Sequence, residues 1–305
     1  MQEAAGNSPV QTSAAGRGWG GQNEVGRIRR VLLHHARSAF TPAAVERDWR
    51  RLGYRAAPDP ERAAAEYDAF VATLTELGVA PEMCDEADSP GLDALYVRDA
   101  AVLCDRGAIL CRMGKPARRA EPGRLGTAFE RLGIPVIGAI EEPGCLEGGD
   151  VAWLDRGTLA VGLGYRTNAS GIEQLGRLLG NTVDRLITVP LPHWKGPEDV
   201  FHLMSMLSPV DRDLAVVYSP LLPAWFRQDL LERGVQLVEV PDDEFETLGC
   251  NVLAVSPRRC LVVASNPTTR GRLEAAGCDV FEYAGEEISR KGEGGPTCLT
   301  LPLLR

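Results

Sequence analysis

Cys298 is the residue whose surroundings point most directly to chemistry. It ends the glycine-rich run Gly-Glu-Gly-Gly-Pro-Thr-Cys over residues 292–298, and the apolar stretch Leu299–Leu304 follows it. Glycines let a backbone approach a ligand closely, so a thiol delivered by such a loop is placed for nucleophilic attack. A free cysteine is more often a small buried apolar residue, and the loop alone leaves both interpretations open.

Other polar residues occupy comparable places, each shortly before an apolar run that predicts a strand. They are Asp93, Arg98, Asp99, Glu147, Asp150 and His202. A lone aspartate at such a place is usually a turn or cap residue. The recurrence of charged groups at the entrance of successive units instead predicts that they converge, together with Cys298, on one central cleft.

The chemistry that suits this set is attack on a guanidino group. Carboxylates hold a planar guanidinium through paired charge-assisted hydrogen bonds. A thiolate can attack the electrophilic central carbon of that cation, and the cation lowers the pKa of the thiol. A histidine can protonate the leaving amine and then activate water. This scheme requires no metal and no cofactor.

His202 is the expected general acid and base. Of the four histidines, it is the one in register with the repeated units described next. His34 and His35 fall within a predicted strand, and His193 falls in the loop Pro-His-Trp-Lys-Gly.

The elements that must position these residues recur along the chain. Four times an apolar run, a short polar turn and a second apolar run follow one another, a pattern typical of a β-hairpin. The turns begin near Asp105, Asp155, Asp211 and Ser256. Their spacing of roughly 50 residues is that of a repeat array.

A helical stretch and one more apolar run follow each hairpin. The predicted helices are 124–132, 170–179, 223–233 and 268–276. The predicted strands after them are 134–140, 186–189, 235–240 and 280–283. Each helix ends at a glycine, the usual C-terminal signal. These glycines are Gly133, Gly180, Gly234 and Gly277. The repeated unit is therefore ββαβ.

A fifth unit lacks one hairpin arm. Arg27–Ala36 is its predicted strand and Pro60–Leu77 its helix, and Leu299–Leu304 could supply the missing arm. Pairing the two ends of the chain would close a ring and remove exposed sheet edges. We therefore expect an α/β fold, a five-fold pseudosymmetric α/β propeller of ββαβ units. The alternative is two α/β domains divided near residue 190.

Composition is that of a globular protein. Hydrophobic residues make up 44% and charged residues 25%, and the net charge of −9 argues against a nucleic-acid or anionic-membrane partner. The eight cysteines form no CxxC pair, which disfavours a zinc site and favours reduced thiols in the cytoplasm. Residues 1–23 are expected to be a disordered tail, and residues 24–305 a single catalytic domain. A homodimer stays open.

The sequence resembles the guanidino-group-modifying, or pentein, superfamily, and within it the dimethylarginine dimethylaminohydrolases. The resemblance runs from about Arg27 to Leu304. The segments that carry it are Glu147-Gly-Gly-Asp-Val, Val161-Gly-Leu-Gly-Tyr-Arg-Thr-Asn-Ala-Ser-Gly, His202-Leu-Met-Ser, Cys250-Asn-Val-Leu and Thr297-Cys298. Each segment is weak alone, and their combination is specific.

The resemblance implies a set of roles. Cys298 would be the nucleophile and His202 the general acid and base, while Asp99 and Glu147 would clamp the guanidinium, beside Asp150. The implied ligands of the amino-acid end of the substrate are Arg166 and Arg118 for the α-carboxylate and Asp93 for the α-amino group.

Two positions depart from a simple match. Arg98 stands before Asp99, where dimethylaminohydrolases usually have glutamate, and Arg-Asp is the pairing of arginine deiminases and amidinotransferases. Met204 stands two residues after His202, where those two classes usually have an aspartate that grips the far side of the guanidinium. Without that aspartate an unsubstituted guanidinium keeps unpaired donors, at a cost of about 1–3 kcal/mol per buried group. Met204 suits an N-methylated end, or it packs into the core.

Three functions follow as hypotheses. The first is hydrolysis of Nω-methylated L-arginine to L-citrulline and a methylamine through an S-alkylthiouronium intermediate. The second is a sibling reaction on another guanidine, by an arginine deiminase, a dihydrolase or an amidinotransferase. The third is a non-catalytic binding module, because the same propeller occurs in a ribosome anti-association factor. A flexible lid is expected near residues 34–58, where proline and arginine are frequent.

Overall fold

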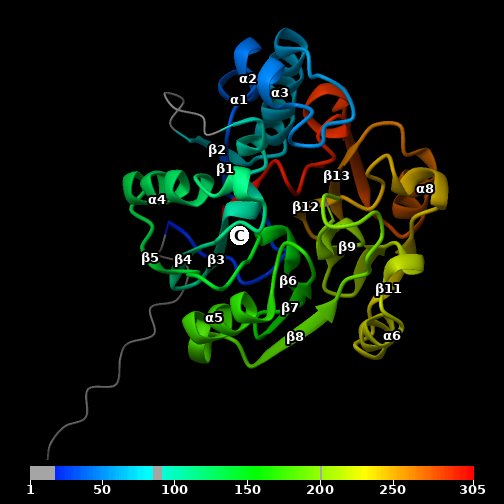
Figure 1. The fold of residues 1–305 in the computed structure, drawn as a ribbon. Coiled ribbons are helices and arrows are strands. Elements are labelled where there is room, and N and C mark those ends of the chain that lie inside the picture. The colour runs from blue at the N-terminus through cyan, green and yellow to red at the C-terminus, as the bar shows by residue number, and fades with distance from the viewer. Residues whose placement is uncertain (1–17, 85–90, 200) are drawn as a thin grey trace, which may run out of the picture.

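The fold is built from small sheets, each of which combines an antiparallel pair with a parallel third strand. The computed structural model describes residues 18–84, 91–199 and 201–305. Over these residues the strands form five three-stranded sheets, which Figure 1 shows in succession around the centre of the view. The predicted α/β architecture of five similar units is thereby confirmed.

Four of the sheets follow the predicted ββαβ order. In each, two strands pair as an antiparallel hairpin, a helix crosses over, and the third strand adds in parallel to the second. The first two sheets consist of β3 (Ala101–Cys104), β4 (Gly107–Leu110), β5 (Val136–Ala139), β6 (Val151–Trp153), β7 (Thr158–Leu163) and β8 (Arg185–Pro190). The next two consist of β9 (Leu207–Asp211), β10 (Leu214–Val217), β11 (Gln236–Glu239), β12 (Leu253–Ser256), β13 (Arg259–Val263) and β14 (Asp279–Tyr283).

The fifth sheet joins the two ends of the described chain. It consists of β15 (Leu301–Leu304), β1 (Arg30–Leu33) and β2 (Ala80–Met83) in that order. β15 runs antiparallel to β1, with Val31 opposite Pro302. The C-terminal strand therefore supplies the arm that the N-terminal unit lacks, as the sequence predicted.

Helices lie between the strands, and those that cross over from the second to the third strand of a unit end where glycine lets the chain reverse. The helices are α1 (Ala36–Ala39), α2 (Pro42–Asp48), α3 (Pro60–Glu76), α4 (Glu121–Arg131), α5 (Ala169–Leu179), α6 (Ala224–Glu232), α7 (Asp242–Phe245) and α8 (Pro267–Ala275). Gly133 after α4 and Gly277 after α8 have φ values of 69° and 83°, a region that favours glycine.

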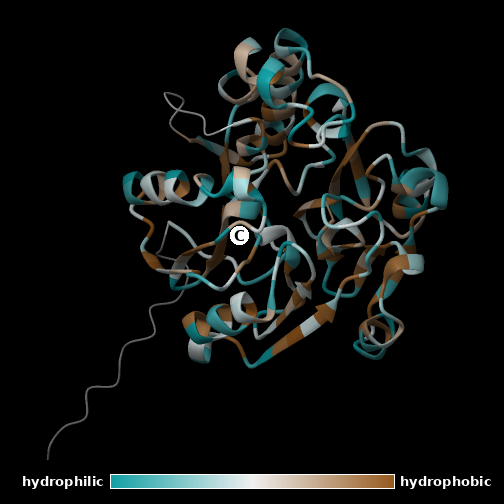
Figure 2. Cartoon of the chain, in the orientation of Figure 1, coloured by the Kyte–Doolittle hydropathy of each residue, from teal (hydrophilic) through white to brown (hydrophobic). Residues whose placement is uncertain are grey.

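Burial separates the strands from the helices. All four residues of β3 and of β10 are buried, whereas α5 buries one face that includes Leu175 and Leu179. Figure 2 shows the same division, with the strands mostly brown and the helices mixing brown with teal. One apolar cluster contains both Ala160 and Leu207, on either side of residue 190, where the alternative placed a domain boundary. The single domain over residues 24–305 stays a prediction.

The N-terminal part differs from expectation in two places. The expected strand over residues 27–36 is shorter, because His35 leaves the strand and caps α1 by accepting a hydrogen bond at Nδ1 from the Arg37 amide. Residues 18–23, expected to belong to a disordered tail, are described, and Gln22 among them is buried. Residues 1–17 of that tail lie outside the described residues. No helix in the described ranges is long and apolar enough to cross a membrane.

The closing strand should contribute strongly to stability. Leu303 in β15 is fully buried, so Leu303→Ala should lower the free energy of unfolding by about 2–5 kcal/mol, through lost apolar burial and the cavity left behind. Urea denaturation would measure it. The control is Leu231→Ala on α6, where the leucine is 39% exposed and the expected change is within about 0.5 kcal/mol. Equal effects would mean that β15 is not part of the stable core.

Candidate active site

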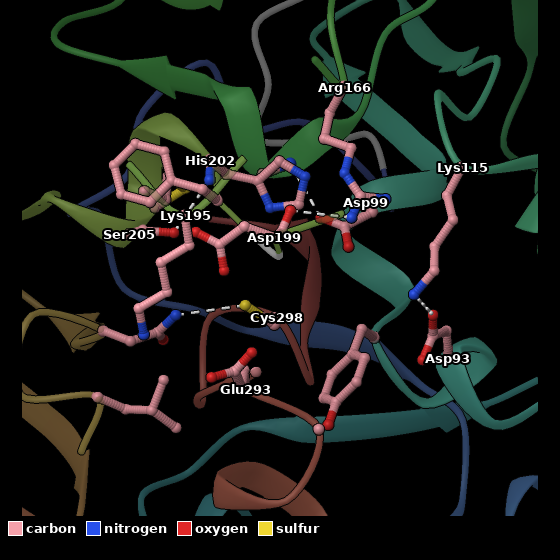
Figure 3. Close-up of a pocket in the computed structure, with 18 of the residues that line it drawn as sticks. Asp93, Asp99, Lys115, Arg166, Lys195, Asp199, His202, Ser205, Glu293 and Cys298 are labelled. Carbon is pink, nitrogen blue, oxygen red and sulfur yellow. Dashed lines mark hydrogen bonds and ion pairs between the residues drawn. The ribbon is translucent and has the colours of Figure 1, made fainter. Parts of the chain in front are cut away.

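The candidate site lies where the segments that precede the first strands of the units meet. Short 3-10 helices occupy residues 97–100, 148–150 and 203–205, directly before β3, β6 and β9. The second of these contacts both of the others. Together with the loop that carries Cys298 they enclose a pocket, drawn in Figure 3. The predicted convergence of these segments on one cleft is therefore present.

Seven of the ten predicted site residues line this pocket. They are Cys298, His202, Asp99, Asp93, Arg166, Arg118 and Met204. The other three, Glu147, Asp150 and Arg98, are buried behind the wall of the pocket as the structure describes it. In Figure 3, His202, Asp99 and Arg166 lie on one side of the Cys298 sulfur and Glu293 lies on the other.

The Cys298 thiol is held by an asparagine from another unit. Asn251, which precedes β12, donates from Nδ2 to the Cys298 sulfur at 3.3 Å. Its Oδ1 accepts hydrogen bonds from the backbone N–H and the hydroxyl of Thr297, and these bonds orient the amide so that an N–H faces the sulfur. Gly295 permits this packing, because a Cβ there would lie 2.5 Å from the Asn251 side chain.

The thiol is protonated before anything binds. Burial raises the pKa of Cys298 to about 11, and the Asp99 carboxylate adds to the effect, while the hydrogen bond from Asn251 acts in the opposite direction. A cation bound beside Asp99 would offset both burial and the carboxylate, since an opposite charge favours the thiolate.

His202 is paired with a buried glutamate. Its Nε2 lies 2.7 Å from Glu147 Oε2. Burial disfavours a charged imidazole, but the surrounding carboxylates, Asp99 foremost, outweigh burial and raise the pKa of His202 to about 9. The same pairing lowers the pKa of Glu147 against the effect of burial. His202 is therefore an imidazolium, a proton donor, at neutral pH.

Glu147 and Asp150 support His202 from behind. Glu147 Oε1 accepts from the backbone N–H groups of Gly114 and Lys115. Asp150 accepts at Oδ1 from the Leu203 amide, 3.0 Å away, and so holds the loop that carries His202. The expectation that Glu147 clamps the guanidinium, with Asp150 beside it, stays a prediction, and the position of both carboxylates, fully buried and outside the lining of the pocket, speaks against it.

Gly149 lets Asp99 and His202 lie close to each other. Its N–H donates to Asp99 Oδ1 at 3.1 Å, and a Cβ at this position would lie 2.7 Å from His202 Nδ1. The Gly-Gly pair between Glu147 and Asp150 thus allows Asp99 and His202 to approach across a bare backbone. Asp99 remains the carboxylate of the predicted clamp that faces the pocket.

Arg118 is committed to the protein. Its Nη1 donates to Asp99 Oδ2 at 2.6 Å, and its Nε and Nη2 donate to the Glu121 carboxylate. Nη2 also donates to the main-chain carbonyls of Asp93 and Tyr96. These contacts show that Arg118 orients Asp99, and the role expected for Arg118, binding a substrate carboxylate, stays a prediction.

Arg166, which lines the pocket, has unused hydrogen-bonding capacity. It is 5% exposed, and its Nη2 donates to the Asp199 carbonyl at 3.0 Å. Its Nε has no hydrogen-bond partner among the described residues. Asp93 also lines the pocket, and its Oδ2 accepts from Lys115 Nζ at 3.1 Å. Figure 3 shows the Lys115–Asp93 pair on the side of Cys298 away from Lys195.

Arg98 and Met204 contact each other beneath the pocket. Arg98 Nη2 lies 3.5 Å from Met204 Sδ, 3.3 Å from the Val151 carbonyl and 2.6 Å from Glu24 Oε1. The guanidinium thus points away from the pocket, which corrects the expectation that Arg98 contacts the substrate. Met204 is 3% exposed and presents an apolar wall.

Sequence reasoning missed the rim of the pocket. Arg55 donates to Glu293 at 2.7 Å and to Glu246 at 2.8 Å, and Lys195 donates to Glu246 at 2.7 Å. Arg55 belongs to the segment expected to form a lid, and Glu293 to the glycine-rich run before Cys298. Both lay within quoted segments, but no spacing rule pairs charges on loops so distant in sequence.

Asp99, Glu147 and His202 also bring potential metal-ligand atoms within 4.8 Å of one another. These atoms already have partners, because Glu147 Oε2 pairs with His202 Nε2 and the Asp99 oxygens accept from Gly149 and Arg118. The arrangement is that of a hydrogen-bonded acid–base group.

Comparison with known proteins agrees with this geometry. The family model of the eukaryotic N,N dimethylarginine dimethylhydrolases matches residues 45–305. The N(G),N(G)-dimethylarginine dimethylaminohydrolase of Streptomyces coelicolor is 32% identical over 239 residues, covering 78% of this chain and 84% of the relative. An arginine deiminase of Listeria monocytogenes is 27% identical over 270 residues, covering 73% of this chain and 65% of the deiminase.

Solved structures show the same fold. A dimethylarginine dimethylaminohydrolase of Pseudomonas aeruginosa, a cysteine-to-serine variant complexed with citrulline, superposes with a TM-score of 0.72 at 23% identity, over 90% of this chain and 99% of that chain. The N-terminal domain of a cyanobacterial arginine dihydrolase, bound to substrate, has a TM-score of 0.76 at 20% identity, over 90% and 98% of the chains. An amidinotransferase of Microseira wollei has a TM-score of 0.74 at 18% identity, over 94% and 97%.

The raised pKa of Cys298 should show in its alkylation. Iodoacetamide modification of the Cys298 peptide, followed by mass spectrometry, should accelerate about tenfold per pH unit between roughly pH 7 and pH 9, because only the thiolate reacts. Asn251→Ala removes a hydrogen bond to sulfur and should raise the pKa, slowing modification at fixed pH about three- to tenfold. The Cys84 peptide of the same sample is the internal control. A rate independent of pH in this range would show that the thiol is already ionised.

Proposed function

Because this chain belongs to the N,N dimethylarginine dimethylhydrolase family, we propose that it hydrolyses an Nω-methylated L-arginine to L-citrulline and a methylamine. The observation that carries the proposal is the pocket itself. Cys298, His202 and Asp99 line it, with the pKa of the thiol and of the imidazole both raised, which supports a site where the Asp99 carboxylate holds a guanidinium. The reactive residues and the cation-binding group thus share one cavity.

Binding of the cation begins the reaction. The guanidinium lies against Asp99 and lowers the pKa of Cys298, which loses its proton to solvent. The thiolate attacks the central carbon, and a tetrahedral adduct forms. His202 donates its proton to the nitrogen that carries the methyl groups, the bond from carbon to that nitrogen breaks, and the methylamine leaves. An S-alkylthiouronium remains on Cys298.

Water completes the turnover. Neutral His202 accepts a proton from a water molecule, and the hydroxide adds to the thiouronium carbon. The bond from carbon to sulfur then breaks and the added hydroxyl loses its proton to solvent, so that neutral citrulline and the Cys298 thiolate are released. Glu147 stabilises His202 as an imidazolium in the first half of the cycle, and Asn251 donates to the leaving sulfur in the second.

Arg166 and Asp93 are proposed to hold the amino-acid end. Arg166 has an Nε without a hydrogen-bond partner among the described residues, which suits a substrate α-carboxylate. Asp93 suits the α-amino group and has Lys115 as its present partner. The bound citrulline in the Pseudomonas aeruginosa relative is the amino acid that the proposed reaction would release.

The substrate could instead be an unsubstituted guanidine, as the likeness to an arginine deiminase suggests. The apolar surface of Met204 favours a methylated end, because it offers no acceptor for the N–H groups of plain arginine.

We also keep as proposals a cytoplasmic location, which fits the eight free thiols, and a homodimer.

A product assay tests the proposed function. Purified protein should convert asymmetric dimethylarginine to citrulline and dimethylamine in equal amounts, and Cys298→Ser should lose this activity at least about a thousandfold, because the hydroxyl is a far weaker nucleophile. Cys84→Ser, outside the pocket, is the matched control and should keep it. Ammonia from plain arginine as the main product would favour the deiminase reaction. Product that appears only with an added amine would favour transfer.

Met204 should set the preference between the two substrates. Met204→Asp should lower kcat/KM for asymmetric dimethylarginine roughly ten- to a hundredfold, because a buried carboxylate then faces methyl groups that cannot pair with it. Turnover of plain arginine should rise in the same variant. Met204→Leu keeps an apolar wall and should keep the wild-type preference. An unchanged ratio in Met204→Asp would show that Met204 does not contact the distal nitrogen.

A further inference from the structure

Glu24 reaches the active site from a part of the chain that the family match leaves out. It precedes residues 45–305, which the family model covers, and it is 4% exposed. The segment around it is fastened at two points. The Gly20 N–H donates to the Leu303 carbonyl at 2.9 Å, and Gln22 Nε2 donates to the carbonyls of Arg156 and Thr182 at 3.0 and 2.9 Å. Glu24 is therefore delivered to the interior by a docked segment.

Arg98 receives this carboxylate directly below the pocket. The ion pair between Glu24 Oε1 and Arg98 Nη2 measures 2.6 Å, and both side chains are at least nine-tenths buried. The same Arg98 nitrogen lies 3.5 Å from the sulfur of Met204. The Arg98 backbone N–H donates to the Cys298 carbonyl at 3.3 Å. One residue thus touches the nucleophile's main chain and the wall of the pocket.

The charge of Arg98 is a problem for a site that binds cations. A buried guanidinium needs a partner, because desolvation of an unpaired charge is costly. Asp99, the next residue, already accepts from Arg118 and Gly149. Without Glu24, the positive charge of Arg98 would act on the guanidino substrate and on Cys298 across a short distance in a medium of low polarity.

We propose that Glu24 is a positioning residue of the active site that acts through Arg98. It neutralises Arg98 beneath the pocket and holds it against Met204 and the main chain of Cys298. Arg98 can therefore lie directly beneath the pocket, and the pocket still accepts a cation. The substrate part of this inference rests on the proposed function, whereas the effect on the thiol does not.

The groups that act on the thiol and on the ion pair are known from the structure. Cys298 feels Asp99 and Arg98, which shift its pKa in opposite directions, and it lies near Tyr96 and Tyr283. His202 lines the same pocket. Glu24 also acts on half-buried Arg305, whose pKa desolvation lowers to about 10 while Glu24 works against that shift. Neutralising Glu24 thus removes the carboxylate that pairs with Arg98.

The decisive experiment compares Glu24→Gln with wild type by two measurements. The first is the pH dependence of iodoacetamide modification of the Cys298 peptide, read by mass spectrometry. The thiol pKa should fall by about half a unit or more, because the positive charge of Arg98 is no longer balanced. The second is steady-state turnover of asymmetric dimethylarginine, in which KM should rise about fivefold or more and kcat should change less.

Two further variants separate charge from folding. Arg98→Gln leaves Glu24 unpaired and should shift the thiol pKa upward, opposite to Glu24→Gln. The double variant Glu24→Gln/Arg98→Gln keeps a hydrogen-bonding pair without charge and should return the thiol pKa toward the wild-type value. Gln22→Ala is the matched control, because it weakens docking of the same segment without changing charge. It should lower the melting temperature and leave the thiol pKa and KM unchanged.

The outcomes decide between the claims. Folded Glu24→Gln with an unchanged thiol pKa and KM would overturn the role of Glu24. If Glu24→Gln does not fold, the same pKa shift in Arg98→Gln and in the double variant would overturn it, because the role requires the double variant to revert. A further outcome is that Glu24→Gln and Arg98→Gln shift the thiol pKa in opposite directions while wild-type protein turns over neither asymmetric dimethylarginine nor arginine. That result would support the role of Glu24 and refute the proposed function. Normal turnover of asymmetric dimethylarginine without any shift of the thiol pKa would support the proposed function and refute the role of Glu24.

Discussion

Charge balance around a buried thiol is the constraint on which this structure depends. The pocket must be dry enough to keep Cys298 neutral until a cation arrives, yet it must hold an imidazolium on His202 and a carboxylate on Asp99. Each charge is matched by a buried partner, because an unpaired one would be too costly. Glu147 stabilises His202, Arg118 orients Asp99, and Glu24 pairs with Arg98. Much of the polar chemistry thus lies behind the residues that face the substrate.

The fold supplies this arrangement by repetition. Each unit places the start of its first strand next to the pocket, so that residues distant in sequence meet without any long excursion of the chain. Two glycines next to the pocket are required because the neighbouring side chains leave no room for a Cβ. Gly149 lies between Asp99 and His202, and Gly295 lies against Asn251. A side chain at either position would collide with a residue of the site.

The sequence was a good guide to the repeats and to the residues at their entrances, since hydrophobic alternation and helix-ending glycines are local signals. The sequence was a poor guide to whether a residue faces the pocket or lies buried behind it. Glu147 and Asp99 were both expected to grip the substrate, but Glu147 lies one layer further in, behind His202. Arg118 and Arg98 likewise have buried partners distant in sequence, Asp99 and Glu24, that no local pattern identifies. Glu24 directly follows residues 1–23, which were expected to be a disordered tail, and its partner is 74 residues away.

The distribution of the site over separate units has a consequence for how such enzymes diverge. Asp99, His202, Asn251 and Cys298 each precede the first strand of a different sheet. A substitution in one loop can therefore alter a single property, such as the polarity next to the nitrogen that would leave, while the other loops keep the proposed nucleophile and proton donor in place. This modularity gives a physical reason why one scaffold serves hydrolases and transferases alike: evolution can exchange one contact at a time without rebuilding the scaffold.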